Sequence, residues 1–128
     1  MSTVKEAFDR YLGDGQPAYV GRYRLTAEDA VAMIRRSGGV ATLAHPGVSK
    51  VQPRELSRLR AMGFDGVEAD HPDQPSEQAA RYREVAAAVD LVCTAGTDFH
   101  GEMISPDRHL GTSRMAVADL ARLEARRP

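Results

Sequence analysis

Three short apolar segments separated by stretches of helical periodicity constrain the fold of this 128-residue chain more than any other feature. They lie at residues 40–45, 66–71 and 91–97. Apolar runs of this length, with helix-patterned segments between them, indicate parallel strands joined by helical crossovers. The sequence therefore predicts an α/β fold of successive strand–helix units, arranged as a single domain over residues 1–128.

Side chains that bind metal ions or transfer protons follow each of the three predicted strands. His45 follows the first strand, residues 68–71 end the second, and Asp98 and His100 follow the third. Because alternate side chains of a strand share a face, Asp98 and His100 are predicted to point the same way. An imidazole and a carboxylate at the carboxyl ends of parallel strands are typical of a hydrolytic metal site in an α/β barrel. We therefore expect His45, Asp98 and His100 to converge at one end of the sheet.

Helix start and stop signals lie between the strands. Thr26 followed by Asp29 resembles a capping box and predicts a helix over residues 27–36, which stops before Gly38-Gly39. The other predicted helices cover residues 4–12, Pro53 to Gly63, Ser76 as N-cap to about residue 89, and about 115–126.

Composition narrows the possible partners and location. A net charge of -1 and a pI near 6.4 provide no electrostatic basis for binding a nucleic-acid duplex or a membrane surface. No apolar run approaches the roughly 20 residues that a membrane helix needs. The single cysteine, Cys93, has no partner for an internal disulfide and is interpreted as a core residue. These observations favour a cytoplasmic protein that binds neither membranes nor stable nucleic-acid duplexes.

Four segments together resemble one known family. They are Gly-Gly-Val-Ala-Thr-Leu-Ala-His-Pro-Gly over residues 38–47, Glu68 through Pro72, Gly-Thr-Asp-Phe-His-Gly over 96–101, and the opening helix over 4–12. The chain resembles the PHP (polymerase and histidinol phosphatase) family, and especially its small bacterial members that act on nucleotides. The resemblance extends over nearly the whole chain. It implies the C-terminal portion of a distorted (βα)7 barrel with parallel strands alternating with helices.

The resemblance also implies a metal site. Family members bind up to three divalent ions, and the matching positions here make His45, Asp98 and His100 the expected ligands. Manganese, iron or zinc suits such a mixture of imidazole and carboxylate. The family's His-x-His motif is absent from this sequence, so we expect a partial PHP domain without the N-terminal metal-binding half. Related sequences often carry a second histidine where this chain has Gln74.

Four further residues are candidates for substrate or catalytic contacts. Strict alternation places His71 on the face opposite Glu68, but a turn at Pro72 would re-aim its ring. His71 would then either contact a substrate phosphate, as a catalytic group, or orient a metal-ligating residue. Glu68 is either an acceptor for a ligating histidine or an acceptor for loop amides. Arg22 and Arg24 either bind a substrate phosphate or are solvated surface charges.

The expected activity is metal-dependent hydrolysis of phosphate monoesters, with small phosphorylated molecules such as nucleotides as substrates. The alternative is a non-catalytic PHP remnant that acts as a binding or oligomerising half-barrel. A three-stranded parallel sheet leaves two edges open. We therefore also predict self-association, or docking to an N-terminal half-domain.

Overall fold

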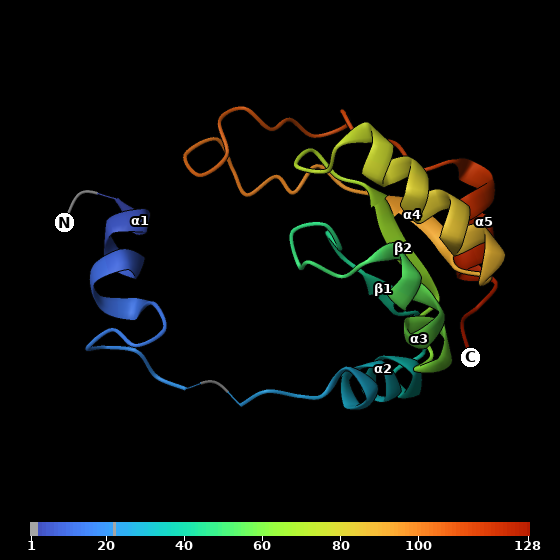
Figure 1. Cartoon of the computed structure of the whole chain (residues 1–128), viewed down its shortest axis with the longest axis horizontal. Helices are drawn as coiled ribbons and strands as arrows, with labels where there is room; N and C mark the ends of the chain where they lie inside the picture. Colours follow the sequence, from blue (N-terminus) through green and yellow to red (C-terminus); the bar gives the residue numbers. More distant parts are fainter. Residues whose placement is uncertain (1–2, 22) are drawn as a thin grey trace.

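A three-stranded parallel sheet forms the centre of the molecule, seen in a computed structural model that describes residues 3–21 and 23–128 (Figure 1). Strand β1 is Thr42–Leu43, β2 is Gly66–Asp70 and β3 is Val92–Ala95, in the order β1-β2-β3. Both neighbouring pairs are parallel. The predicted α/β fold with parallel strands alternating with helices is therefore confirmed, although each strand is shorter than its apolar segment.

The register between β2 and β3 shifts near the end of β2. Glu68 pairs with Thr94, whereas Asp70 pairs with the next residue of β3, Ala95. Two residues of β2 therefore lie opposite one residue of β3, as in a β-bulge. A bulge bends the strand and changes the direction of the side chains that follow. The irregularity lies immediately before His71.

The helices follow the predicted crossovers closely. Thr26 caps α2 through a 3.1 Å bond from the Asp29 N–H to its Oγ1, as predicted. Ser76 is the first residue of α4 and makes no side-chain cap bond, so its prediction as N-cap was wrong; Pro75 holds that position. The bounds are α1 Val4–Ala7 continuing as η1 Phe8–Leu12, α2 Ala27–Arg36, η2 Pro53–Glu55, α3 Leu56–Ala61, α4 Ser76–Ala88 and α5 Val117–Glu124.

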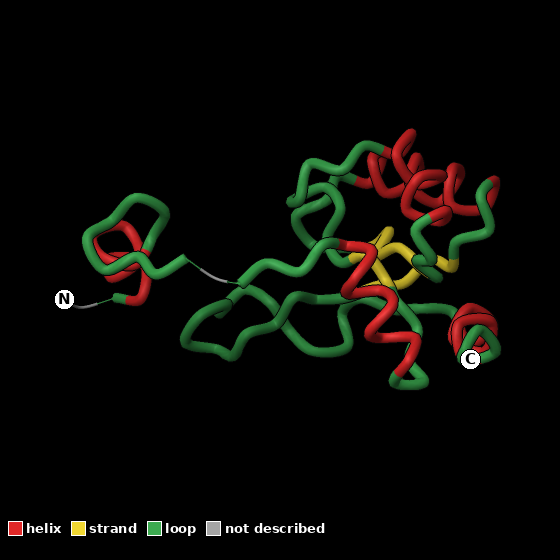
Figure 2. Tube along the Cα trace, turned by 90° about the horizontal axis from the view of Figure 1, so that it is seen from below, coloured by secondary structure: helices red, strands yellow, loops and turns green. Residues whose placement is uncertain are grey.

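The hydrophobic core lies between the sheet and the helices α3 and α4. Its fully buried members are Leu56, Val67, Ala69, Tyr82, Ala86 and Leu91. Figure 2 shows helices on both sides of the short strands. The Tyr82 hydroxyl donates a hydrogen bond to the carbonyl of Val51, and burial raises the pKa of that hydroxyl. This hydrogen bond connects α4, which carries Tyr82, to the loop after β1, which carries Val51.

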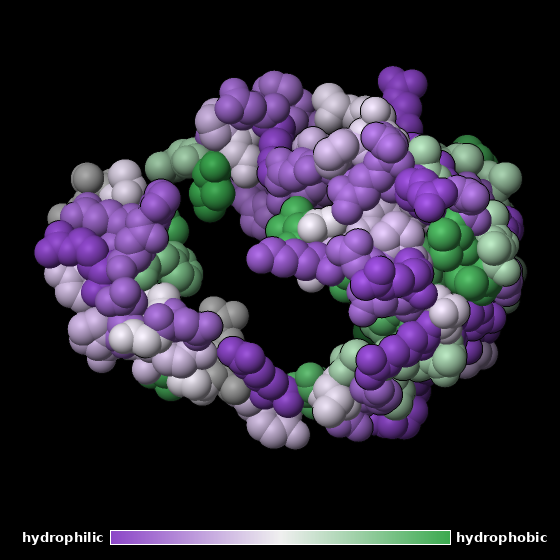
Figure 3. Space-filling view, in the orientation of Figure 1, coloured by the Kyte–Doolittle hydropathy of each residue, from purple (hydrophilic) through white to green (hydrophobic). Residues whose placement is uncertain are grey.

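Residues 3–21 lie apart from the sheet, at the end of an extended segment (Figures 1 and 3). Large apolar side chains in this part of the chain are exposed, including Phe8 at 47% and Val20 at 80%. Exposed apolar surface of this kind is typical of interaction sites. Self-association and docking to another half-domain stay predictions. None of the helices in the described residues is long and apolar enough to cross a membrane.

Cys93 in β3 is expected to react slowly with iodoacetamide. Burial raises the pKa of its thiol, and the charge of Asp119 raises it further. Only the thiolate is nucleophilic, so the alkylation rate should keep rising at pH values where a free cysteine is already fully ionised. Mass spectrometry across a pH series measures this, with the urea-unfolded chain as the control. If the alkylation rate of the folded chain reached half its maximum at or below the pH found for the unfolded chain, the expected pKa shift would be contradicted.

Candidate metal and phosphate site

His71 carries a buried ring nitrogen with no hydrogen-bond partner, at the carboxyl end of β2. The side chain is 1% exposed, and its Nε2 is the one buried side-chain polar atom without a partner among the described residues. Its Nδ1 accepts the backbone N–H of Asp73 at 3.1 Å. A nitrogen that accepts is unprotonated, so the neutral ring holds its proton on Nε2. His71 is therefore a hydrogen-bond donor that points into the site.

Asp98 lies between two histidines just beyond β3. Its Oδ2 is 3.7 Å from His71 Nε2, too far for a hydrogen bond, and its Oδ1 is 3.6 Å from His100 Nδ1. The backbone of Asp98 has a φ of 51°, and that of His45 has a φ of 31°. Non-glycine residues in this left-handed region are uncommon and concentrate at functional sites. Two of the three predicted metal ligands share this conformation.

His100 has the opposite hydrogen-bonding pattern to His71. Its Nδ1 lies 2.8 Å from the carbonyl oxygen of Asp98. A carbonyl only accepts, so this Nδ1 carries a proton, and in the neutral ring the lone pair is on Nε2. An imidazole oriented by a backbone carbonyl in this way is typical of metal-ligating histidines. The side chain is 58% exposed, which leaves that lone pair accessible.

His45 joins the site from the end of β1. Its ring lies edge-on to that of His71, with 5.8 Å between the ring centroids. Its backbone N–H donates to Glu68 Oε2 at 2.6 Å. The contact supports the interpretation of Glu68 as an acceptor for loop amides. Gln74, where related sequences often have histidine, bridges the same region by accepting from the Gly47 N–H and donating to the Ala69 carbonyl.

Two charged residues of the site were missed by the sequence analysis. Asp73 follows His71 in the turn after β2, and Arg108 lies in the loop before α5. Arg108 donates to Asp73 Oδ2 at 2.5 Å and also to Asp98 Oδ2. The hydrogen bond with Asp73, followed by the charges of Asp73 and Asp98, raises the pKa of Arg108. Asp73 could have been suspected from its place beside His71, whereas no sequence pattern links Arg108 to Asp98.

One group of three potential metal ligands occurs among the described residues. It comprises His71, Asp73 and Asp98, with one ligand atom of each within 4.8 Å of the others. His71 Nε2 can bind a metal ion only if its proton moves to Nδ1. Nδ1 could then no longer accept the Asp73 N–H, which argues against His71 as a ligand. The carboxylates of Asp73 and Asp98 supply oxygen ligands that suit a divalent ion, whereas His100 is not a member of this group. The predicted set of His45, Asp98 and His100 stays a prediction.

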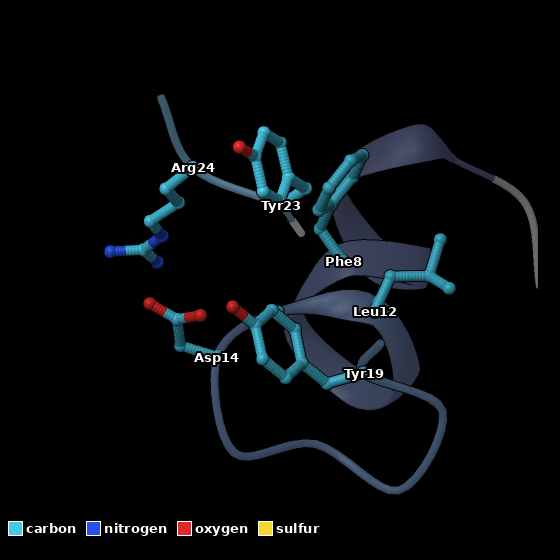
Figure 4. Close-up of a pocket in the computed structure, with 7 residues that line it drawn as sticks. Phe8, Leu12, Asp14, Tyr19, Tyr23 and Arg24 are labelled. Atoms are coloured by element: carbon cyan, nitrogen blue, oxygen red, sulfur yellow. The ribbon is translucent and has the colours of Figure 1, made fainter. Parts of the chain in front are cut away.

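Arg24, one of the two arginines predicted to bind phosphate, is not part of this cluster. Arg22 lies outside the described residues. Arg24 lines a separate pocket in the N-terminal segment (Figure 4). The other lining residues are Phe8, Leu12, Gly13, Asp14, Tyr19 and Tyr23.

Known proteins with similar sequences are phosphoesterases. The chain is 42% identical over 76 residues to the phosphoribosyl 1,2-cyclic phosphate 1,2-diphosphodiesterase of Eggerthella lenta, a match that covers 59% of this chain and 29% of that protein. It is 31% identical over 104 residues to the 3′,5′-nucleoside bisphosphate phosphatase of Chromobacterium violaceum, covering 78% and 36% respectively. The chain thus spans about a third of the length of these relatives. No family model matches the sequence.

A solved structure of a protein assigned as a phosphoesterase has the same fold. A crystallised protein from Bifidobacterium adolescentis, assigned as a metal-dependent phosphoesterase, superposes with a TM-score of 0.75 and 26% identity over 97% of this chain and 44% of that one. An α/β fold with imidazoles and carboxylates at the strand ends is typical of hydrolytic metal sites in barrel proteins. The relatives are PHP-type phosphoesterases, and the chain matches part of such a protein, which confirms the resemblance predicted from the sequence.

Proposed function

We propose that this chain contributes a metal-dependent phosphoesterase site that acts on small phosphorylated substrates, with nucleotides as the favoured class. The observation that carries the proposal is the buried, unpartnered Nε2 of His71, which faces Asp98 across 3.7 Å. A buried donor without a partner is costly unless a ligand satisfies it. A phosphoryl oxygen is an acceptor of the right chemistry, and the activities of the relatives support this choice.

Each side chain has a distinct role in this proposal. A divalent ion bound by Asp98 and His100, with Asp73 or His45 beside them, would supply positive charge that polarises a phosphoryl oxygen. Manganese, iron and zinc remain the preferred candidates for that ion. His71 donates its Nε2 proton toward a phosphoryl or leaving-group oxygen. Glu68 holds the backbone of His45 in place through the 2.6 Å bond.

Phosphate release from adenosine 3′,5′-bisphosphate, with and without Mn²⁺, tests the proposal. Asp98→Asn removes the charge between the two histidines. We expect at least about a hundredfold loss of metal-dependent release, the order seen when one electrostatic group of an active site is removed. His71→Ala should lose at least about tenfold through its missing donor. Asp107→Asn, an exposed aspartate in the loop after β3, is the matched control.

Three results would contradict this function. They are release that a chelator leaves unchanged, release that Asp98→Asn leaves unchanged, and no release from a folded wild-type chain that binds Mn²⁺. The last result would favour the alternative of a non-catalytic binding domain. Urea unfolding of each variant separates a lost site from a lost fold.

A further inference from the structure

Arg108 spans the ends of two neighbouring strands through its guanidinium group. One terminal nitrogen, Nη2, donates to Asp73 Oδ2 at 2.5 Å, beyond β2. The other, Nη1, donates to Asp98 Oδ2 and lies 3.4 Å from the Asp98 carbonyl oxygen, beyond β3. The side chain is 21% exposed, so it is largely packed into the site. Arg108 is thus a fixed positive charge between two carboxylates.

The same two carboxylates are the anionic members of the candidate metal group. Asp98 Oδ2 in particular faces His71 and accepts from Arg108. A carboxylate oxygen that a guanidinium occupies offers less negative charge to a second cation, and two cations at one oxygen repel each other. A divalent ion that binds Asp73 or Asp98 must therefore weaken or displace the contacts of Arg108.

We propose that Arg108 sets the metal affinity of this site by competing with the divalent ion for the carboxylates of Asp73 and Asp98. The inference rests on the proposed function only for the presence of a divalent ion, and it does not require turnover. It assigns to Arg108 a positioning role: the guanidinium holds the two acidic loops together, and metal binding releases it. The loop that carries Arg108 lies between β3 and α5, drawn in orange in Figure 1.

Calorimetric titration with Mn²⁺ at constant ionic strength tests the competition directly. Arg108→Gln keeps hydrogen-bonding capacity and removes the charge. We expect its dissociation constant for Mn²⁺ to fall about tenfold, the factor that corresponds to roughly 1.4 kcal/mol of lost competition. Arg114→Gln makes the same change of net charge at an exposed position of the same loop and should change the constant little.

A second measurement uses the wild-type chain, in case Arg108→Gln does not fold. Phenylglyoxal modifies accessible arginines, and peptide mapping reports each site. Added Mn²⁺ should raise the modification of Arg108 relative to that of Arg114. Weaker or unchanged Mn²⁺ binding by folded Arg108→Gln, no Mn²⁺ binding by either chain, or modification of Arg108 that Mn²⁺ leaves unchanged or lowers would each overturn the inference. None of these readouts depends on phosphate release, so the inference and the proposed function fail separately.

Discussion

Replacing Asp65 by alanine is expected to lower the free energy of unfolding by about 3 kcal/mol, because buried hydrogen bonds to a charged group are among the strongest. The Asp65 side chain is 2% exposed. Its carboxylate accepts the backbone N–H of Ala41 at 3.0 Å and two bonds from Arg35 at 2.9 and 3.1 Å. These contacts join α2 and the start of β1 to the start of β2.

The expected cost arises mainly at Ala41. In the alanine variant the buried N–H of Ala41 loses its acceptor, whereas Arg35, with 39% of its side chain exposed, can return to water. Urea unfolding followed by circular dichroism measures the change, and Asp107→Ala at an exposed position is the control. A loss below about 1 kcal/mol, the usual range of a surface ion pair, would mean that Asp65 does not anchor the sheet.

Gly96→Ala is expected to destabilise the fold and disturb the candidate site together. A Cβ at position 96 would lie 2.0 Å from Glu68 Oε1. The Glu68 side chain must then move, and its Oε2 gives up the bond from the His45 N–H. The partly buried N–H of His45 then loses its acceptor, which costs about 1–3 kcal/mol. We expect a loss of about 2 kcal/mol in the free energy of unfolding, on the same scale.

A double-mutant cycle with Glu68→Ala isolates the cause. If the clash with Glu68 dominates, Gly96→Ala should be neutral or stabilising by up to about 1 kcal/mol when Glu68 is already alanine, because alanine restricts the unfolded chain more than glycine does. Urea unfolding of the four chains provides the coupling energy. Strictly additive effects would show that the glycine is required for another reason.

Local patterns were sufficient for the type and sequence order of the main helices and strands, but not for all their bounds. The helix Ala27–Arg36 was predicted to the residue, since its Thr26 cap and the glycines after it act within a few positions of the chain. That the strands are parallel also follows from the apolar segments and crossover lengths, whereas the order β1-β2-β3 comes from the structure. The strands are shorter than the apolar segments, and β1 is only Thr42–Leu43.

The pairing within the site depended on the tertiary structure. The sequence alone determined an α/β chain with imidazoles and carboxylates at the strand ends, because strand periodicity and helix capping are local. It did not determine that the proton of His71 faces Asp98, which follows from a register shift in β2 and a bond to the Asp73 N–H. Nor did it determine that Arg108 binds Asp73, 35 positions away. Such contacts arise only when packing brings separate loops together, and no local pattern encodes them.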